Sequence, residues 1–184
     1  MFLSMQKKND IADNILILGI GNILLQDEGV GVHTIRELEK CAKGLPGYPD
    51  NYRETGTPSE EWPENIHLLD GGTGGFHMLS IVQEYKTIVM IDATIDNDPP
   101  GTIKVVEPRF ASDFPKALSS HDIGLKDLVE SATLLGFLPK IYLITVTIDQ
   151  NQELGMELSK QIHNTIPVII AEIKSILKQI NHTN

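Results

Sequence analysis

Three side chains that lie far apart in the sequence have the types and positions that could hold one metal ion. Glu28 follows an apolar run and a glycine-rich turn, Asp92 closes another apolar run, and His121 directly precedes a helical pattern. Two carboxylates and one imidazole form an N,O,O donor set that suits zinc, nickel and similar divalent metals, with coordination positions left for water or substrate. The sequence therefore raises the hypothesis of a metal site made by these residues.

The same side chains also have an ordinary structural interpretation. Asp27 and Glu28 would favour the positive end of a helix dipole, Asp92 would cap a strand, and His121 would lie beside an N-cap formed by a neighbouring serine. Charged residues are common at helix starts, so the residues alone leave this alternative open.

The stretch Ile15–Gly31 indicates the kind of fold that must position these residues. It contains an apolar strand, a turn at Gly19–Leu25, and the acidic start of a helix. A strand that ends at glycines and leads into a helix is the opening unit of an open α/β sheet. In such sheets, ligands bind in the crevice beyond the carboxyl ends of the strands.

Periodicity and breaker residues predict nine elements along the chain. The expected strands are Ile15–Ile20, Ile66–Leu69, Thr87–Ile91, Thr102–Glu107 and Lys140–Ile148. The expected helices are Asp27–Lys43, Phe76–Glu84, Asp122–Leu135 and Glu153–Gln179, the last bent or broken near Pro167. The third and fourth strands are joined by only about ten residues, fewer than a parallel crossover needs, so the fourth is expected to be an antiparallel edge strand.

This topology brings the three candidate ligands to one rim. The first, third and fifth strands should be parallel, and a strand order 2-1-3 would make Glu28 and Asp92 face each other across the switch point. The helix at Asp122–Leu135 must begin at the same rim so that the fifth strand can start at the opposite one. The connection 109–120 is long enough, at up to ~3.3–3.6 Å per extended residue, to return the chain there and place His121 beside both carboxylates.

Bulk properties narrow the function classes. The 184 residues fit one domain, expected at 15–180 after a frayed segment 1–14 and interrupted by a surface loop at Gly44–Asn65. The net charge of −10 argues against nucleic-acid and anionic-membrane partners. With a single cysteine, no apolar run near the ~20 residues of a membrane helix and no signal-peptide pattern, we expect a cytoplasmic protein.

A nucleotide-binding protein is the alternative that the glycine turn suggests. Gly19 and Gly21 resemble the start of a GxGxxG fingerprint, but Leu24 replaces the third glycine. Asp27 and Glu28 would also place negative charge where a pyrophosphate requires amide donors. These departures argue against nucleotide binding.

Four segments, in order, carry a resemblance to a known family. They are GIGNILLQDEGVGV, LLDGGTGG, an apolar strand closing in IDA, and SSHDIGL before a helix. Together they resemble the hydrogenase maturation endopeptidases, which process the large subunit of nickel–iron hydrogenases. The resemblance implies a three-layer α/β fold: a twisted, mostly parallel five-stranded sheet with helices on both faces, consistent with the antiparallel edge strand expected above.

The resemblance also implies roles for individual residues. It assigns Glu28, Asp92 and His121 as metal-binding and catalytic residues of an aspartyl-type endopeptidase. The second motif would contact or shape substrate, and Asn22 would do likewise. The substrate-binding residues implied in this way are Asn22, Asp70, Gly71, Gly72 and Thr73.

The implied reaction removes a C-terminal extension from the hydrogenase large-subunit precursor after nickel insertion. The metal would be nickel, supplied by the substrate or held as a cofactor, and zinc or cadmium could substitute for it. We expect a monomer whose partner is the precursor, with no nucleotide, nucleic-acid or membrane ligand. The alternative function is a nickel-dependent chaperone that binds the precursor without cutting it.

Overall fold

A computed structural model describes residues 14–41, 65–75, 78–114 and 122–183. The expectations for the N-terminal segment, for most of the loop at 44–65 and for His121 itself fall outside these ranges.

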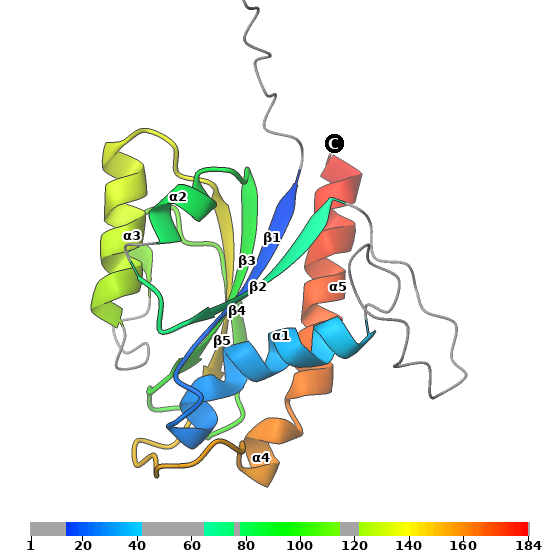
Figure 1. Cartoon of the computed structure of the whole chain (residues 1–184). Coiled ribbons are helices and arrows are strands. Elements are labelled where there is room, and N and C mark those ends of the chain that lie inside the picture. Colours follow the sequence, from blue (N-terminus) through cyan, green and yellow to red (C-terminus); the bar gives the residue numbers. More distant parts are fainter. Residues whose placement is uncertain (1–13, 42–64, 76–77, 115–121, 184) are drawn as a thin grey trace, which may run out of the picture.

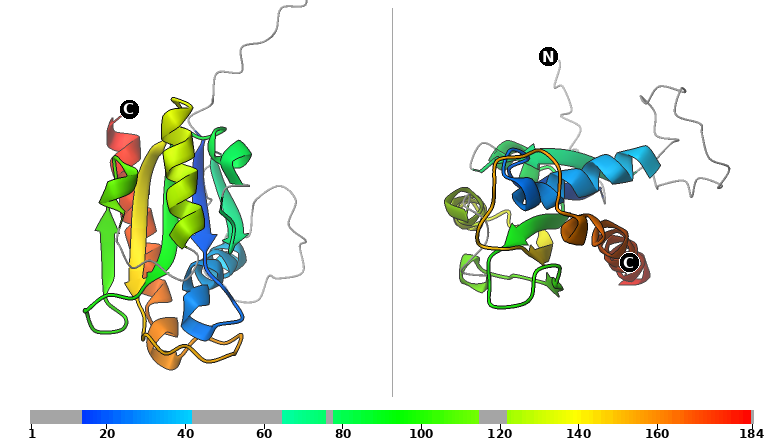
Figure 2. Two further views of the ribbon diagram at one scale, coloured as in Figure 1. Left: turned by 90° about the vertical axis from the view of Figure 1, so that its left-hand side faces the viewer. Right: turned by 90° about the horizontal axis from the view of Figure 1, so that it is seen from below.

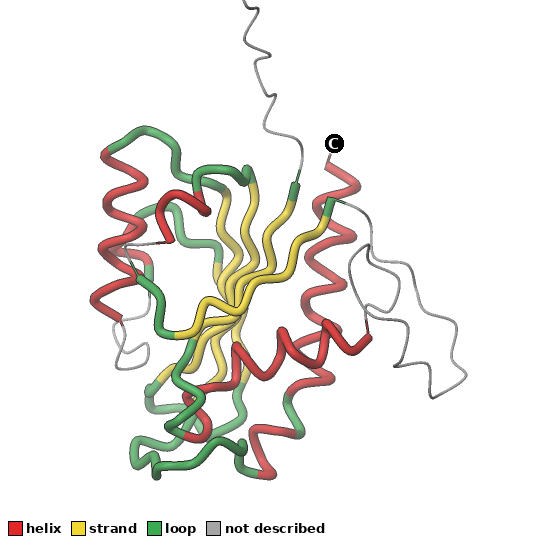
Figure 3. The backbone as a smooth tube through the Cα atoms, in the orientation of Figure 1, coloured by secondary structure: helices red, strands yellow, loops and turns green. Residues whose placement is uncertain are grey.

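The centre of the molecule is a five-stranded sheet with the order β2-β1-β3-β5-β4 (Figure 1). Its strands are β1 (Ile15–Ile20), β2 (Ile66–Gly72), β3 (Thr87–Thr94), β4 (Ile103–Val106) and β5 (Lys140–Thr147). The first three and β5 are parallel, and β4 pairs antiparallel with β5 at the edge. The expected order around β1 and the antiparallel edge strand are both confirmed. Figure 3 shows the twist that accumulates across these strands.

The central strands are apolar on both faces because helices cover both. Every residue of β1 is buried. Its odd-numbered isoleucines pack into one cluster with α1 (Val30–Cys41) and α5 (Ile166–Thr183). Leu16, Leu18 and Ile20 face a second cluster with α2 (Leu79–Val82) and α3 (Asp122–Leu134). Figure 2 shows the resulting three layers, which confirm the expected fold class.

Two strands are longer than their sequence patterns indicated. The strand β3 continues through Thr94, because Asp92, Ala93 and Thr94 keep pairing with β5 in register. Asp92 therefore lies inside the strand and does not close it. Similarly, β2 extends to Gly72 by pairing with β1 across an irregularity between Gly19 and Ile20.

Two helices begin differently from their predicted starts. The segment Gln26–Gly29 forms a 3-10 helix, η1, before α1 begins at Val30. At the other end of the chain, residues 153–159 are not helical, and the predicted single helix is a short α4 (Lys160–His163) followed by α5. Pro167 lies in the first turn of α5, where its missing N–H is tolerated, so the helix starts beside this proline and does not break at it. In the described ranges, no helix combines the length and apolarity needed to cross a membrane.

Candidate active site

Glu28 lies on a turn that only glycine allows to close. Gly21 has φ of 139°, and a Cβ there would lie 1.8 Å from the Glu28 carbonyl oxygen. The turn therefore folds back tightly onto the end of β1, and the Glu28 amide donates a hydrogen bond to the Leu25 carbonyl at 3.0 Å. Glu28 is only 5% exposed. Its carboxylate is thus part of a fixed local structure, unlike the side chain of a solvated helix face.

Asp92 is positioned by the sheet itself. It is 2% exposed, and its Oδ1 accepts a hydrogen bond from the Ala93 amide at 2.8 Å. Because side chains alternate along a strand, Asp92 shares the face of Ile88 and Met90, which is the face that α3 covers. On β5 its register partner is Thr145, also buried.

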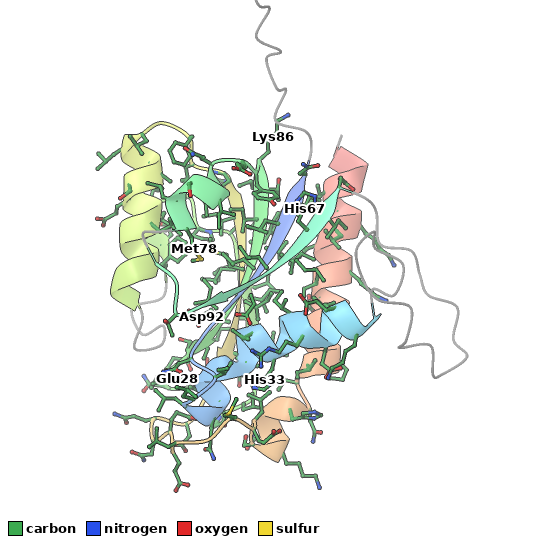
Figure 4. The ribbon with its side chains drawn as sticks, in the orientation of Figure 1. Glu28, His33, His67, Met78, Lys86 and Asp92 are labelled. Atoms are coloured by element: carbon green, nitrogen blue, oxygen red, sulfur yellow. The ribbon has the colours of Figure 1, made fainter. Side chains whose placement is uncertain are left out.

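The two carboxylates come from segments that meet at the predicted switch point. The strands β1 and β3 are neighbours, and η1 packs against β3. The first turn of α1 also lies close to both strands, because a Cβ at Gly31 would lie 2.3 Å from the carbonyl oxygens of Ile20 and Ile91. Figure 4 shows Asp92 within the sheet and Glu28 below it on this turn.

The third candidate ligand, His121, lies outside the described residues. The helix that follows it begins at Asp122, and α3 must begin at the carboxyl end of the sheet because it leads into the amino end of β5. Figure 1 shows this arrangement. Among the residues that the structure describes, no three His, Cys, Asp or Glu side chains gather closely enough to hold a metal. A complete metal site from this set therefore requires His121.

The expected substrate-binding residues lie on the turn after β1 and at the adjoining end of β2. The Gly21 amide donates to the Gly72 carbonyl at 2.8 Å, which joins the turn after β1 to the end of β2. Asn22 uses its Oδ1 to accept from the Leu24 amide at 3.0 Å. Thr73 is exposed, whereas Gly71 is partly buried. These residues thus form part of the rim near Glu28.

Asp70 has partners that explain its position without a ligand. Its Oδ1 accepts from the Gly72 amide at 3.0 Å, and its Oδ2 lies 3.4 Å from the Arg36 guanidinium. Both side chains of this ion pair are about 40% exposed, at 42% for Arg36 and 40% for Asp70. The ion pair ties the end of β2 to α1.

A loop after β5 holds the η1 turn from the other side. We call residues 148–159 the β5–α4 loop. Gly155 donates to the Leu24 carbonyl at 3.0 Å and accepts from the Gln26 amide at 2.9 Å. Asp27 accepts from the Ser159 amide at 2.7 Å, and the Asp27 amide donates to the Gln152 side chain at 3.0 Å. Asp27 is 6% exposed, so its carboxylate is buried within these contacts. We call the contacts of Asp27 with Gln152 and Ser159 the clamp.

His33, on α1, lies beneath the same loop. Burial, then the nearby Arg36 charge, lowers the pKa of His33, while a hydrogen bond to the Met156 backbone opposes this shift. Its Nε2 is the one buried side-chain nitrogen or oxygen atom of the described residues that lacks a hydrogen-bond partner. His33 therefore favours its neutral form.

Sequence reasoning missed the clamp and a set of buried threonines. Thr94, Thr145 and Thr147 are each no more than 2% exposed and line β3 and β5 beside Asp92. The alternation in TVTID around Thr145 was a usable signal, because polar residues at every second position of an otherwise apolar strand indicate a polar patch on one face. No local pattern indicated that Asp27 would bond to Ser159, since 132 positions separate them.

The fold and this site together define an open α/β protein with two buried carboxylates at its switch point. A family model described as hydrogenase maturation protease matches residues 57–176. Asp92 and His121 lie inside this range, and Glu28 precedes it.

Individual relatives extend the match over most of the chain. The hydrogenase expression/formation protein HupD of Rhizobium leguminosarum bv. viciae is 30% identical over 172 residues, covering 91% of this chain and 75% of HupD. The hydrogenase 2 maturation protease of Escherichia coli (strain K12) is 26% identical over 167 residues, covering 90% of this chain and 91% of that protease. The HupD of Thiocapsa roseopersicina is 34% identical, and the match covers 83% of this chain but 62% of that relative.

Solved structures show the same fold. The hydrogenase maturating endopeptidase HybD from E. coli superposes with a TM-score of 0.71 at 27% identity, covering 90% of this chain and 93% of HybD. For HybD from Thermococcus kodakarensis the TM-score is 0.66 at 23% identity, over 89% and 98% of the two chains. The chain belongs to the hydrogenase maturation protease family, and it is a peptidase.

Proposed function

We propose that this protein removes the C-terminal extension of a nickel–iron hydrogenase large-subunit precursor after nickel insertion. In this proposal Glu28, Asp92 and His121 recognise the nickel that the precursor carries. The observation that supports it most directly is the burial of two carboxylates, from η1 and β3, at the switch point of the sheet.

The donor chemistry fits a divalent metal. Two carboxylates and one imidazole form an oxygen- and nitrogen-donor set that zinc, nickel and similar divalent metals accept. Asp92 faces the side of the sheet that α3 covers, and α3 starts at the carboxyl rim. We therefore expect His121, the residue directly before α3, to complete the set.

The chain's own residues hold and orient the substrate in this scheme. Glu28 and Asp92 supply oxygen ligands, and His121 supplies a nitrogen ligand. The rim residues Asn22 and Gly71–Thr73 would contact the peptide beside them. When bound, the metal supplies Lewis acidity that polarises the scissile carbonyl or activates water.

The decisive experiment is incubation of the purified protein with nickel-loaded precursor. We expect a faster-migrating large subunit on gels and a short released peptide in mass spectrometry. Glu28→Gln, Asp92→Asn and His121→Ala should each abolish processing while the circular dichroism spectrum stays native. Asp98→Asn is a suitable control, because Asp98 is a carboxylate in a turn after β3 that pairs with Lys104.

The outcomes separate this proposal from its alternative. A complex with the precursor that never shortens it would instead favour a nickel-dependent chaperone. Full activity in two of the three site variants would remove the assignment of these ligands. Cadmium or zinc in place of nickel should bind to the wild type and fail to bind to Asp92→Asn.

A further inference from the structure

Three exposed apolar side chains lie together at the rim that carries Glu28. Leu24 is 56% exposed, Leu154 is 86% exposed and Met156 is 56% exposed. Leu24 belongs to the turn after β1, and the other two belong to the β5–α4 loop. Figure 2 shows these two segments side by side at the carboxyl end of the sheet. We call these three side chains the rim patch.

Backbone pairing fixes the geometry of the rim patch. Leu25 and Gly155 form a parallel bridge, closed by the two hydrogen bonds of Gly155. Leu24 and Leu154 each precede a bridged residue by one, and Met156 follows Gly155. The three residues are therefore direct chain neighbours of the bridged pair, and their exposed side chains stand on two backbone segments that the bridge holds together. A small apolar surface is therefore built into the rim and held by the same contacts that hold η1.

The β5–α4 loop itself carries charged side chains of one sign. The β5–α4 loop contains Asp149, Glu153 and Glu157, all exposed, and no lysine or arginine. A partner that covers this loop must therefore combine an apolar group, which contacts the rim patch, with positive charge, which faces the acidic side chains. Like charges across an interface are unfavourable.

We propose that the rim patch is the docking surface for the stretch of the precursor next to the scissile bond, and that this stretch carries an apolar side chain flanked by lysine or arginine. The proposal rests on the proposed function. Leu24 and Leu25 lead directly into η1, which carries Glu28. A polypeptide whose cleavage point reaches the two carboxylates therefore lies beside the rim patch.

The test compares two leucines with the same exposure at opposite ends of the molecule. Leu154 is 86% exposed at the rim, and Leu134 is 87% exposed at the end of α3, near the amino ends of the parallel strands. In processing assays with nickel-loaded precursor, Leu154→Ser should raise KM roughly tenfold with little change in kcat, the loss expected for truncation of one interface anchor. Leu134→Ser should leave both constants at the wild-type value. Neither side chain is buried, so both variants should fold.

A charge reversal tests whether the docked stretch of the precursor carries lysine or arginine. Glu153→Lys should weaken precursor binding, measured by biolayer interferometry, and should reduce the dependence of the association rate on salt. Glu84→Lys, an exposed carboxylate before β3, is the control and should change neither.

Equal KM values for Leu154→Ser and Leu134→Ser would overturn the docking surface. The docking surface would also be overturned if Leu154→Ser changed the oligomeric state of the protein without changing KM. That result would show that a second copy of the chain covers the rim patch. If the wild type leaves the precursor uncut, the proposed function fails, and the binding measurement still decides whether the rim patch holds the precursor.

Discussion

Replacing Asp27 with alanine tests whether the β5–α4 loop holds the turn that carries Glu28. The Asp27 carboxylate is buried and accepts a hydrogen bond of 2.7 Å from the Ser159 amide. Alanine would leave that amide without its acceptor, and a hydrogen bond to a charged group contributes about 1.5–3 kcal/mol. Asp27→Ala should therefore lower the free energy of unfolding by about 1.5–3 kcal/mol.

For a chain of this size, 1 kcal/mol corresponds to about 2–4 °C in Tm, so the melting temperature should fall by about 3–12 °C. Asp27→Asn keeps an acceptor oxygen, and we expect it to lose about half as much or less. Urea denaturation gives the free energy, and amide hydrogen exchange reports the local effect. Exchange should accelerate at Ser159 and Glu28 and stay unchanged at Val89 in the core of β3.

A matched control separates the clamp from a general charge effect. Asp98→Ala removes a partly exposed carboxylate that pairs with Lys104, and such surface pairs contribute about 0–1 kcal/mol. The clamp is refuted if Asp27→Ala is no more destabilising than Asp98→Ala, or if exchange at Ser159 does not change.

Three further predictions follow from single contacts. Gly31→Ala places a Cβ 2.3 Å from two backbone carbonyl oxygens, so α1 must move away from the sheet. The free energy of unfolding should fall by about 1–3 kcal/mol, and processing should decrease. Gly155→Ala, the control, should be tolerated. The pKa of His33 is lowered by burial, so the unfolded chain binds this proton more readily. Stability should therefore fall as the pH drops below about 6.5, and His33→Leu should lose that part of the pH dependence in urea melts at pH 7.5 and 5. Asp70→Asn should weaken processing less than Glu28→Gln does, because its ion pair with α1 is exposed.

Each of these has a clear contrary outcome. Gly31→Ala with wild-type stability would show that α1 can shift at no cost. An unaltered pH dependence in His33→Leu would mean that another group titrates in this range. Loss of all processing in Asp70→Asn would place that carboxylate among the residues that contact the reacting peptide.

The parts of the fold that sequence could predict are those that depend on local pattern. Uninterrupted apolar runs at β1 and β3 indicated buried strands, and the structure confirms this burial. The short link before β4 correctly indicated an antiparallel edge strand, because chain length alone excludes a parallel crossover.

The parts that sequence did not indicate depend on contacts between distant segments. Asp92 lies within β3 because pairing with β5 extends the strand past the apolar run. The stretch before α4 is not helical, and its backbone instead bonds to the turn after β1 through Gly155. Such tertiary contacts override local propensity, and no single segment carries a sign of them.

The central claim is that Glu28, Asp92 and His121 bind one cation. The most direct measurement is an anomalous difference map from crystals soaked in a cadmium or nickel salt. We predict one strong peak bounded by these two carboxylates and the imidazole, and no peak in crystals of Asp92→Asn. A map with no peak at this position, or with His121 directed away from Glu28 and Asp92, would contradict it.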